Sequence, residues 1–113
     1  MQVPVGLQFL QFFALKEVQN DDIRPGLWGV VNNAGISGSI GPPEWLTVDD
    51  YKVTNSVNLY GLIDVTMTFL PLVKMARGRV VNTASVAGRF SSAHLLPYCV
   101  SKYGVEAFTD GLR

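Results

Sequence analysis

The sequence has little of the chemistry that builds disulfide or metal centres. Cys99 is its only cysteine and His94 its only histidine among 113 residues. An intrachain disulfide framework and a cysteine-built metal site are therefore excluded, and no cluster of metal-ligand type is present, so we expect no metal. Nine basic residues balance nine acidic ones without forming a stripe, which argues against nucleic acid as a partner.

Charged residues are also few, at 16%, whereas apolar residues make up 48%. This composition is typical of a packed domain rather than a disordered chain. The N-terminal stretch "MQVPVGLQFLQFFALKEVQ" is apolar for about fourteen residues, fewer than the roughly 20 that a membrane-spanning helix needs. It lacks the basic start of a secretory signal, so we expect an amphipathic or buried helix there.

Two short apolar runs predict strands buried on both faces, as in a parallel sheet: Leu27–Asn32 and Gly78–Ser85. The glycine- and proline-rich stretch 33–43 predicts a loop. Thr47, followed three residues later by an aspartate, resembles a capping box and predicts a helix that continues to about Ala76.

Proline residues suggest where helices end and begin. Pro71 should end or bend the long helix, and Pro97 can open a final helix from its first turn. The resulting order is helix, strand, helix, strand, helix, which predicts an α/β fold with parallel strands. In such sheets ligands bind beyond the carboxyl ends of the strands.

Polar residues collect at those strand ends. Asn32 and Asn33 close the first strand, Ser85 closes the second, and "YCVSK" then runs from Tyr98 to Lys102. On a helix, residues four apart share a face, so the phenol and the ammonium can converge. A nearby cation lowers the pKa of a phenol by roughly 1–3 from its usual value of about 10, which makes the pair a candidate acid/base device.

The arrangement "NNAG … N … S … YxxxK" resembles the short-chain dehydrogenase/reductase superfamily, whose members pass a hydride between a nicotinamide cofactor and a carbonyl or alcohol. Asn58 supplies the isolated asparagine, and Ser85 lies thirteen residues before Tyr98. The resemblance implies a fragment of a doubly wound, parallel-sheet Rossmann-like fold.

The resemblance also implies roles for these residues. Tyr98 would donate and accept the proton, and Lys102 would lower its pKa and hold the nicotinamide ribose. Ser85 would polarise the substrate oxygen, and Asn58 would hold a water through its backbone carbonyl at a helix irregularity. The turn that packs against the adenine side of the cofactor would be formed by Asn33, Ala34 and Gly35.

Each residue, taken singly, also has an ordinary interpretation. Tyr98 could be an amphipathic surface residue and Lys102 a solvated charge. Asn33 could be a turn residue, Ser85 a loop hydroxyl, and Asn58 a polar residue on an apolar helix. The interpretation as a catalytic site depends on all of these features occurring in order.

Three longer stretches, "GLWGVVNNAG", "LPLVKMARGRVVN" and "YCVSKYGVEAF", resemble the branch of retinol and hydroxysteroid dehydrogenases. This branch implies a retinoid- or steroid-like apolar alcohol or ketone as substrate, and NAD or NADP as cofactor, with NAD slightly favoured. It further implies association with the endoplasmic reticulum membrane and a homo-oligomer formed through the two long helices.

The resemblance covers about residues 16–113, and the sequence contains neither G-x-G-x-x-G nor the family's TGxxxGxG. Residues 1–113 are therefore expected to be the central part of a short-chain dehydrogenase domain, without the glycine-rich cofactor loop or the substrate lid, and inactive alone. The alternative is a non-catalytic interaction fragment that dimerises with a full-length family member through helices 47–76 and 97–113.

Overall fold

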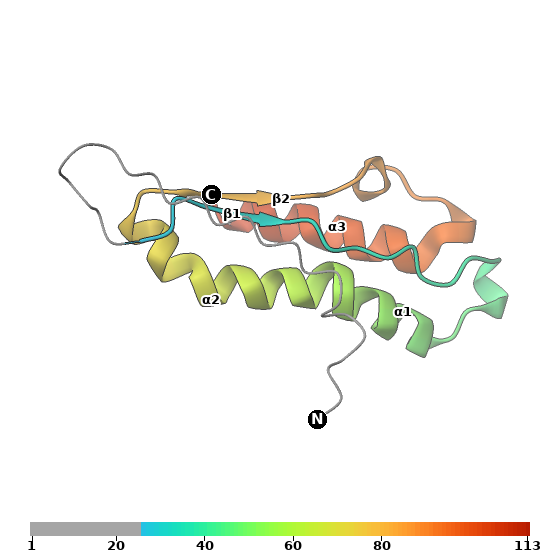
Figure 1. Cartoon of the computed structure of the whole chain (residues 1–113). Helices are drawn as coiled ribbons and strands as arrows, with labels where there is room; N and C mark the ends of the chain where they lie inside the picture. The colour runs from blue at the N-terminus through green and yellow to red at the C-terminus, as the bar shows by residue number, and fades with distance from the viewer. Residues whose placement is uncertain (1–25) are drawn as a thin grey trace, which may run out of the picture.

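The computed structural model describes residues 26–113, so the helix expected near the N-terminus lies outside the described residues. Two strands, β1 (Gly29–Asn32) and β2 (Arg79–Asn82), pair in parallel, with Asn32 opposite Asn82 at the end of the register. Long helices run alongside this ribbon (Figure 1). The predicted α/β arrangement with parallel strands is confirmed.

The helices cover one face of the two-stranded sheet. Asn32 and Asn82 hydrogen-bond to residues of two different helices, Thr66 and Thr109, and register partners on parallel strands point to the same side. On the opposite side Val81 is 51% exposed. The expectation that the second strand is buried on both faces is therefore wrong for the described residues, because no described element covers that face.

A single helical run connects the strands. It consists of α1 (Val48–Asn55), a π-helical segment η3 (Ser56–Gly61) and α2 (Leu62–Met75). The predicted capping interaction is present, because the backbone N–H of Thr47 donates to the Asp50 carboxylate at 2.7 Å. The helix thus begins where the sequence predicts.

Pro71 does not end this helix, which continues to Met75. Its ring removes one backbone donor, but the neighbouring turns keep the helix intact. The run Val48–Met75 is also long and apolar enough, by length and composition, to cross a membrane. Helices in the core of globular proteins pass the same test, and this run packs against β1, β2 and the last helix.

The chain returns from β2 through two short 3-10 turns, η4 (Val86–Gly88) and η5 (Ala93–Leu95), to α3 (Leu96–Gly111). A third turn, η2 (Pro43–Trp45), precedes α1. Pro97 lies buried in the first turn of α3, as predicted. Gly104 lets α3 approach the long helix closely, because a Cβ there would lie 2.6 Å from Leu59 Cδ2.

Small and polar side chains fill much of the interface between the helices and the sheet. Cys99 is buried in α3 and acts as a small packing residue. Buried apolar side chains of the described residues include Val30, Val57, Leu62, Val73, Cys99 and Val105. Buried polar side chains, which include Asn58, Ser101 and Lys102, form the candidate site.

Candidate active site

The side chain of Asn58 joins three parts of the chain. It is fully buried, its Oδ1 accepts from the backbone N–H of Ile36 at 2.8 Å, and its Nδ2 donates to the Ile36 carbonyl at 2.8 Å. The same Nδ2 donates to Ser101 Oγ on α3 at 3.0 Å. The Asn58 amide thus hydrogen-bonds to the N–H and the carbonyl of Ile36, in the loop after β1, and also to α3, which carries Tyr98.

Asn58 lies within η3, where the α-helix widens into a π-helix. Such bulges are frequent at functional sites because they shift side chains and backbone carbonyls from their regular positions. The irregularity predicted at this residue is confirmed. The proposed use of its backbone carbonyl to hold a water stays a prediction, and the structural role of the side chain was not foreseen.

Tyr98 and Lys102 lie together on α3. The Lys102 Nζ is 5.6 Å from the centroid of the Tyr98 ring, as the spacing of four residues predicts. Tyr98 is half-buried, whereas Lys102 is only 4% exposed and donates to the Thr83 carbonyl at 3.0 Å. The ordinary interpretation of Lys102 as a solvated surface charge is therefore wrong.

Gly35 borders the same ammonium group. A Cβ placed on Gly35 would lie 3.6 Å from Asn58 Oδ1 and 3.7 Å from Lys102 Nζ, which are ordinary van der Waals distances. The polypeptide itself therefore has room for a side chain at Gly35. Among the described residues Lys102 has one hydrogen-bond acceptor, so two of its three N–H donors remain for a bound molecule.

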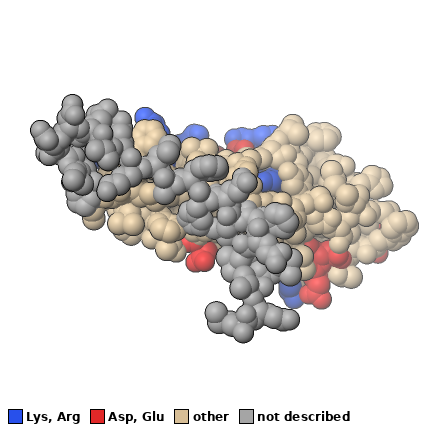
Figure 2. Space-filling model, in the orientation of Figure 1, with Lys and Arg blue, Asp and Glu red and all other residues tan. Residues whose placement is uncertain are grey.

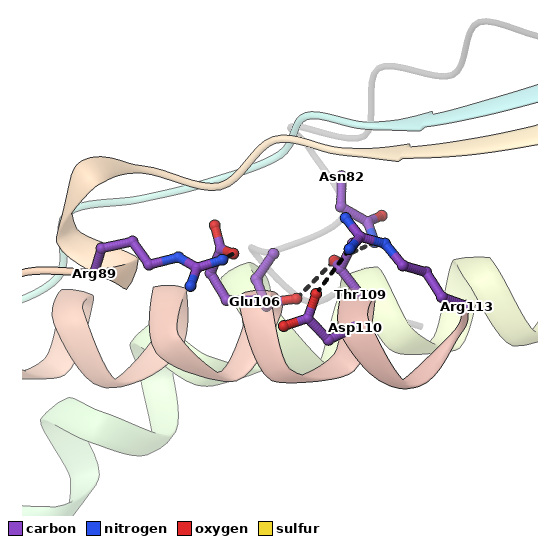
Figure 3. A network of polar contacts seen from close by, with 7 residues as sticks. Asn82, Arg89, Glu106, Thr109, Asp110 and Arg113 are labelled. Atoms are coloured by element: carbon purple, nitrogen blue, oxygen red, sulfur yellow. Dashed lines mark hydrogen bonds and ion pairs between the residues drawn. The ribbon is translucent and has the colours of Figure 1, made fainter.

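Ser85 follows β2 and caps the η4 turn. Its Oγ accepts from the backbone N–H of Ala87 at 3.1 Å. The turn is held against α3, because a Cβ on Gly88 would lie only 2.8 Å from the Lys102 carbonyl oxygen. An ion pair of 2.6 Å between Arg89 and Glu106 adds a second link (Figure 3). Ser85 is thus connected to the helix that carries Lys102.

The remaining predicted cofactor residues lie in the loop after β1, with Asn33 and Gly35 exposed and Ala34 half-buried. Ser39 ties this loop to the start of α1 by donating to the Asp50 carboxylate. The bond from Ser39, together with those from Thr47, lowers the pKa of Asp50 below its ordinary value. The stabilisation by these bonds is present above that ordinary value and is lost as the pH falls through the lowered pKa.

Two residues that hold this site were not predicted. Ser101 immediately precedes Lys102, and its hydroxyl donates to the Tyr98 carbonyl at 2.7 Å. Its place inside "YCVSK" is the only sequence signal that could have found it. Thr83 contributes a backbone carbonyl, which residue type does not predict. Among the described residues no group of three or more potential metal ligands exists.

Comparison with known proteins gives a consistent family match. The profile described as "short chain dehydrogenase" matches residues 14–113. Retinol dehydrogenase 16 of Rattus norvegicus is 59% identical over 88 residues, which are 78% of this chain and 27% of that protein. The mitochondrial D-beta-hydroxybutyrate dehydrogenase of Bos taurus is 50% identical over 93 residues, 82% of this chain and 27% of that protein. The chain thus spans about a quarter of the length of these relatives.

Solved structures share the fold. A short-chain dehydrogenase from Escherichia coli CFT073, complexed with NADPH, gives a TM-score of 0.73 at 30% identity, covering 78% of this chain and 37% of that one. An NAD+-bound xylitol dehydrogenase gives 0.73 at 28% identity, covering 77% and 34%. The two parallel strands and their helices are therefore part of a Rossmann-like fold.

The first prediction concerns Asn58. Asn58→Ala should lower the free energy of unfolding by about 2–4 kcal/mol, because it removes three hydrogen bonds and leaves buried partners unpaired. Urea unfolding measures this change, with Asn33→Ala, at an exposed position of the same loop, as the control. If the two variants are equally stable, the Asn58 amide does not hold the loop.

Proposed function

The chain belongs to the short-chain dehydrogenase family, and from that premise we propose that its parent protein is an NAD(P)-dependent oxidoreductase acting on an alcohol or ketone. One observation carries the proposal: a half-buried tyrosine and a buried lysine share one face of α3, with Nζ 5.6 Å from the ring centroid. Among the described residues this ammonium has one acceptor, a backbone carbonyl. Burying a charge so sparsely paired costs free energy, which favours a role beyond folding.

Lys102 and Gly35 fit the nicotinamide-ribose end of such a cofactor. Lys102 has two donors for ribose hydroxyls, and Gly35 offers an open backbone beside it. Asn33 and Ala34 would line the adenine side, and Gly35 would continue this turn to Lys102 and the ribose. No G-x-G-x-x-G occurs among residues 1–113, so these residues alone do not fit the diphosphate.

When bound, a nicotinamide cofactor accepts the hydride from the alcohol carbon or delivers it to the carbonyl carbon. In alcohol oxidation the Tyr98 oxygen takes the hydroxyl proton as the carbon–hydrogen bond breaks, and in ketone reduction Tyr98 returns it. The Ser85 hydroxyl would donate a hydrogen bond to the substrate oxygen. The Lys102 ammonium would lie beside Tyr98. The backbone carbonyl of Asn58 would bind a water that supplies protons to Lys102.

The substrate we propose is an apolar alcohol or ketone of retinoid or steroid-like shape. The support is the identity of 59% to a protein named retinol dehydrogenase. We propose NAD or NADP as cofactor, because structural neighbours are named as bound to NAD+ or complexed with NADPH. Association with the endoplasmic reticulum membrane is proposed from the same branch, although one relative at 50% identity is named as mitochondrial.

A second candidate function is non-catalytic pairing with a full-length family member. The helices expose several large apolar side chains: Val53, Tyr60, Met67, Met75, Val100 and Tyr103. In the view of Figure 2, residues other than Lys, Arg, Asp and Glu cover most of the described surface. Exposed apolar side chains such as these favour a protein partner.

The second prediction tests the catalytic assignment in the full-length protein. Tyr98→Phe should lower turnover by about a hundredfold or more, because it removes the acid/base group, and should leave cofactor affinity nearly intact. Lys102→Ala should damage both, because it also removes ribose contacts. Steady-state rates with retinol, and nucleotide fluorescence, report the two quantities. A Tyr98→Phe protein that keeps more than a few per cent of activity would disprove the assignment.

The third prediction tests the cofactor turn. Gly35→Ala should weaken NAD(P)H binding by about tenfold, because the new methyl group occupies space needed by the ligand. The melting temperature should not change, since a Cβ at this position makes only ordinary contacts with the protein. Gly111→Ala is the control, because a Cβ there meets nothing within 4 Å. Equal affinity in both variants would place the cofactor elsewhere.

The fourth prediction concerns the polypeptide of residues 1–113 alone. We expect no saturable binding of NADH or NADPH in the micromolar range and no turnover of retinol, because its residues offer no diphosphate site. Lowered activity of a full-length relative upon mixing would support the pairing function. Turnover that disappears in Tyr98→Phe would show that residues 1–113 suffice for catalysis.

A further inference from the structure

Two asparagines occupy core-facing positions at the ends of both strands. Asn32 and Asn82 are register partners, and the Nδ2 of Asn32 donates to the Oδ1 of Asn82 at 2.7 Å. Strand positions that face a helical layer are normally apolar, because burying an amide costs free energy unless it is fully hydrogen-bonded. A valine pair would pack there without that cost, so the amides require another explanation.

The pair extends to a helix on each side. Asn32 Nδ2 also donates to Thr66 Oγ1 on α2 at 2.9 Å. Asn82 Nδ2 donates to Thr109 Oγ1 on α3 at 2.9 Å, and Figure 3 shows these two residues. We call these four residues, Thr66, Asn32, Asn82 and Thr109, the polar bridge. It runs without interruption from α2 across both strands to α3.

The direction of every bond in the polar bridge is fixed. The Thr66 hydroxyl donates its only proton to the Leu62 carbonyl at 2.8 Å, and the Thr109 hydroxyl donates to the Val105 carbonyl at 2.7 Å. Both hydroxyls can therefore only accept from the amides, which sets the orientation of each asparagine. Among the described residues no buried side-chain nitrogen or oxygen lacks a partner, and a network of this kind favours one arrangement of its elements.

The polar bridge is adjacent to Thr83, whose backbone carbonyl accepts a hydrogen bond from Lys102. Thr83 follows Asn82; its backbone N–H donates to the Asn32 carbonyl at 2.9 Å, and its own carbonyl accepts from Lys102 Nζ at 3.0 Å. On α3, Lys102 and Thr109 are seven residues apart and lie on one face. The end of β2 is thus fastened to α3 at two points, one of which is the lysine.

We propose that Asn82 and Thr109 are positioning residues, which hold the Thr83 carbonyl where it anchors the Lys102 ammonium. The consequence for catalysis rests on the proposed function, because there Lys102 serves the cofactor and Tyr98. The positioning itself does not depend on activity and can be measured directly on the lysine.

The test is competitive labelling of the full-length protein with a trace of acetic anhydride, with the extent of acetylation at each lysine read by mass spectrometry. Thr109→Val keeps the shape of the side chain and removes the acceptor for Asn82. Labelling of Lys102 should rise about three- to tenfold, the effect of losing one hydrogen bond. Lys52 and Lys74, both exposed, should keep their wild-type labelling. Thr109→Ser, which retains the hydroxyl, should restore Lys102 to the wild-type level.

A control separates positioning from general loosening. Val73→Ala removes buried apolar volume from α2, where Val73 is 4% exposed. The variant and the wild type are each labelled at the same number of degrees below their own melting temperature. It should leave Lys102 labelling unchanged. Wild-type labelling of Lys102 in Thr109→Val, or an equal rise in Val73→Ala, would overturn the proposal.

Enzyme kinetics supply the second readout. In Thr109→Val the KM for the cofactor should rise by more than kcat falls, and Thr109→Ser should reverse the change. A KM equal to that of the wild type, together with changed labelling, would support the positioning of Lys102 and overturn its consequence for cofactor binding. Failure of the proposed function gives a different result, because turnover would then survive Tyr98→Phe while Lys102 labelling still responds to Thr109→Val.

Discussion

The amide of Asn58 is the interaction on which the rest of the site depends. Buried completely at the π-helical segment, it bonds both backbone groups of Ile36 and the Ser101 hydroxyl. These bonds connect the loop after β1, the long helix and α3, three segments far apart in the sequence. Because the amide is fully buried, the three segments must keep these positions for it to remain satisfied.

The second constraint is the burial of a cation. The Lys102 ammonium lies almost out of solvent, with the Thr83 carbonyl as its acceptor and the Tyr98 ring beside it. Desolvation makes such a charge costly, so its location is set by the few groups that face it. The polar bridge fixes the strand end from which Thr83 extends, and the exposed Gly35 borders the ammonium. Family membership and this geometry together support a nicotinamide-dependent oxidoreductase.

The sequence predicted those features that depend on residue type and spacing: the parallel strands, the cap at Thr47, the place of Pro97 in the first turn of α3 and the convergence of Tyr98 with Lys102. It did not predict features that depend on which elements cover each other. The outer face of β2 is exposed, and Pro71 is accommodated inside a helix. Backbone acceptors such as the Thr83 carbonyl leave no trace in residue identity, so only the folded structure reveals the anchor of Lys102.

The central claim is that Tyr98, Lys102 and the turn at Gly35 surround one nicotinamide site. A crystal structure of the full-length protein with NAD(P)+ and a substrate-like alcohol tests this claim most directly. The account predicts ribose hydroxyls within hydrogen-bonding distance of Lys102 Nζ, the alcohol oxygen bonded to Tyr98 and Ser85, and the cofactor against Gly35. A nicotinamide bound away from Lys102, with Tyr98 making no contact to the alcohol, would contradict it.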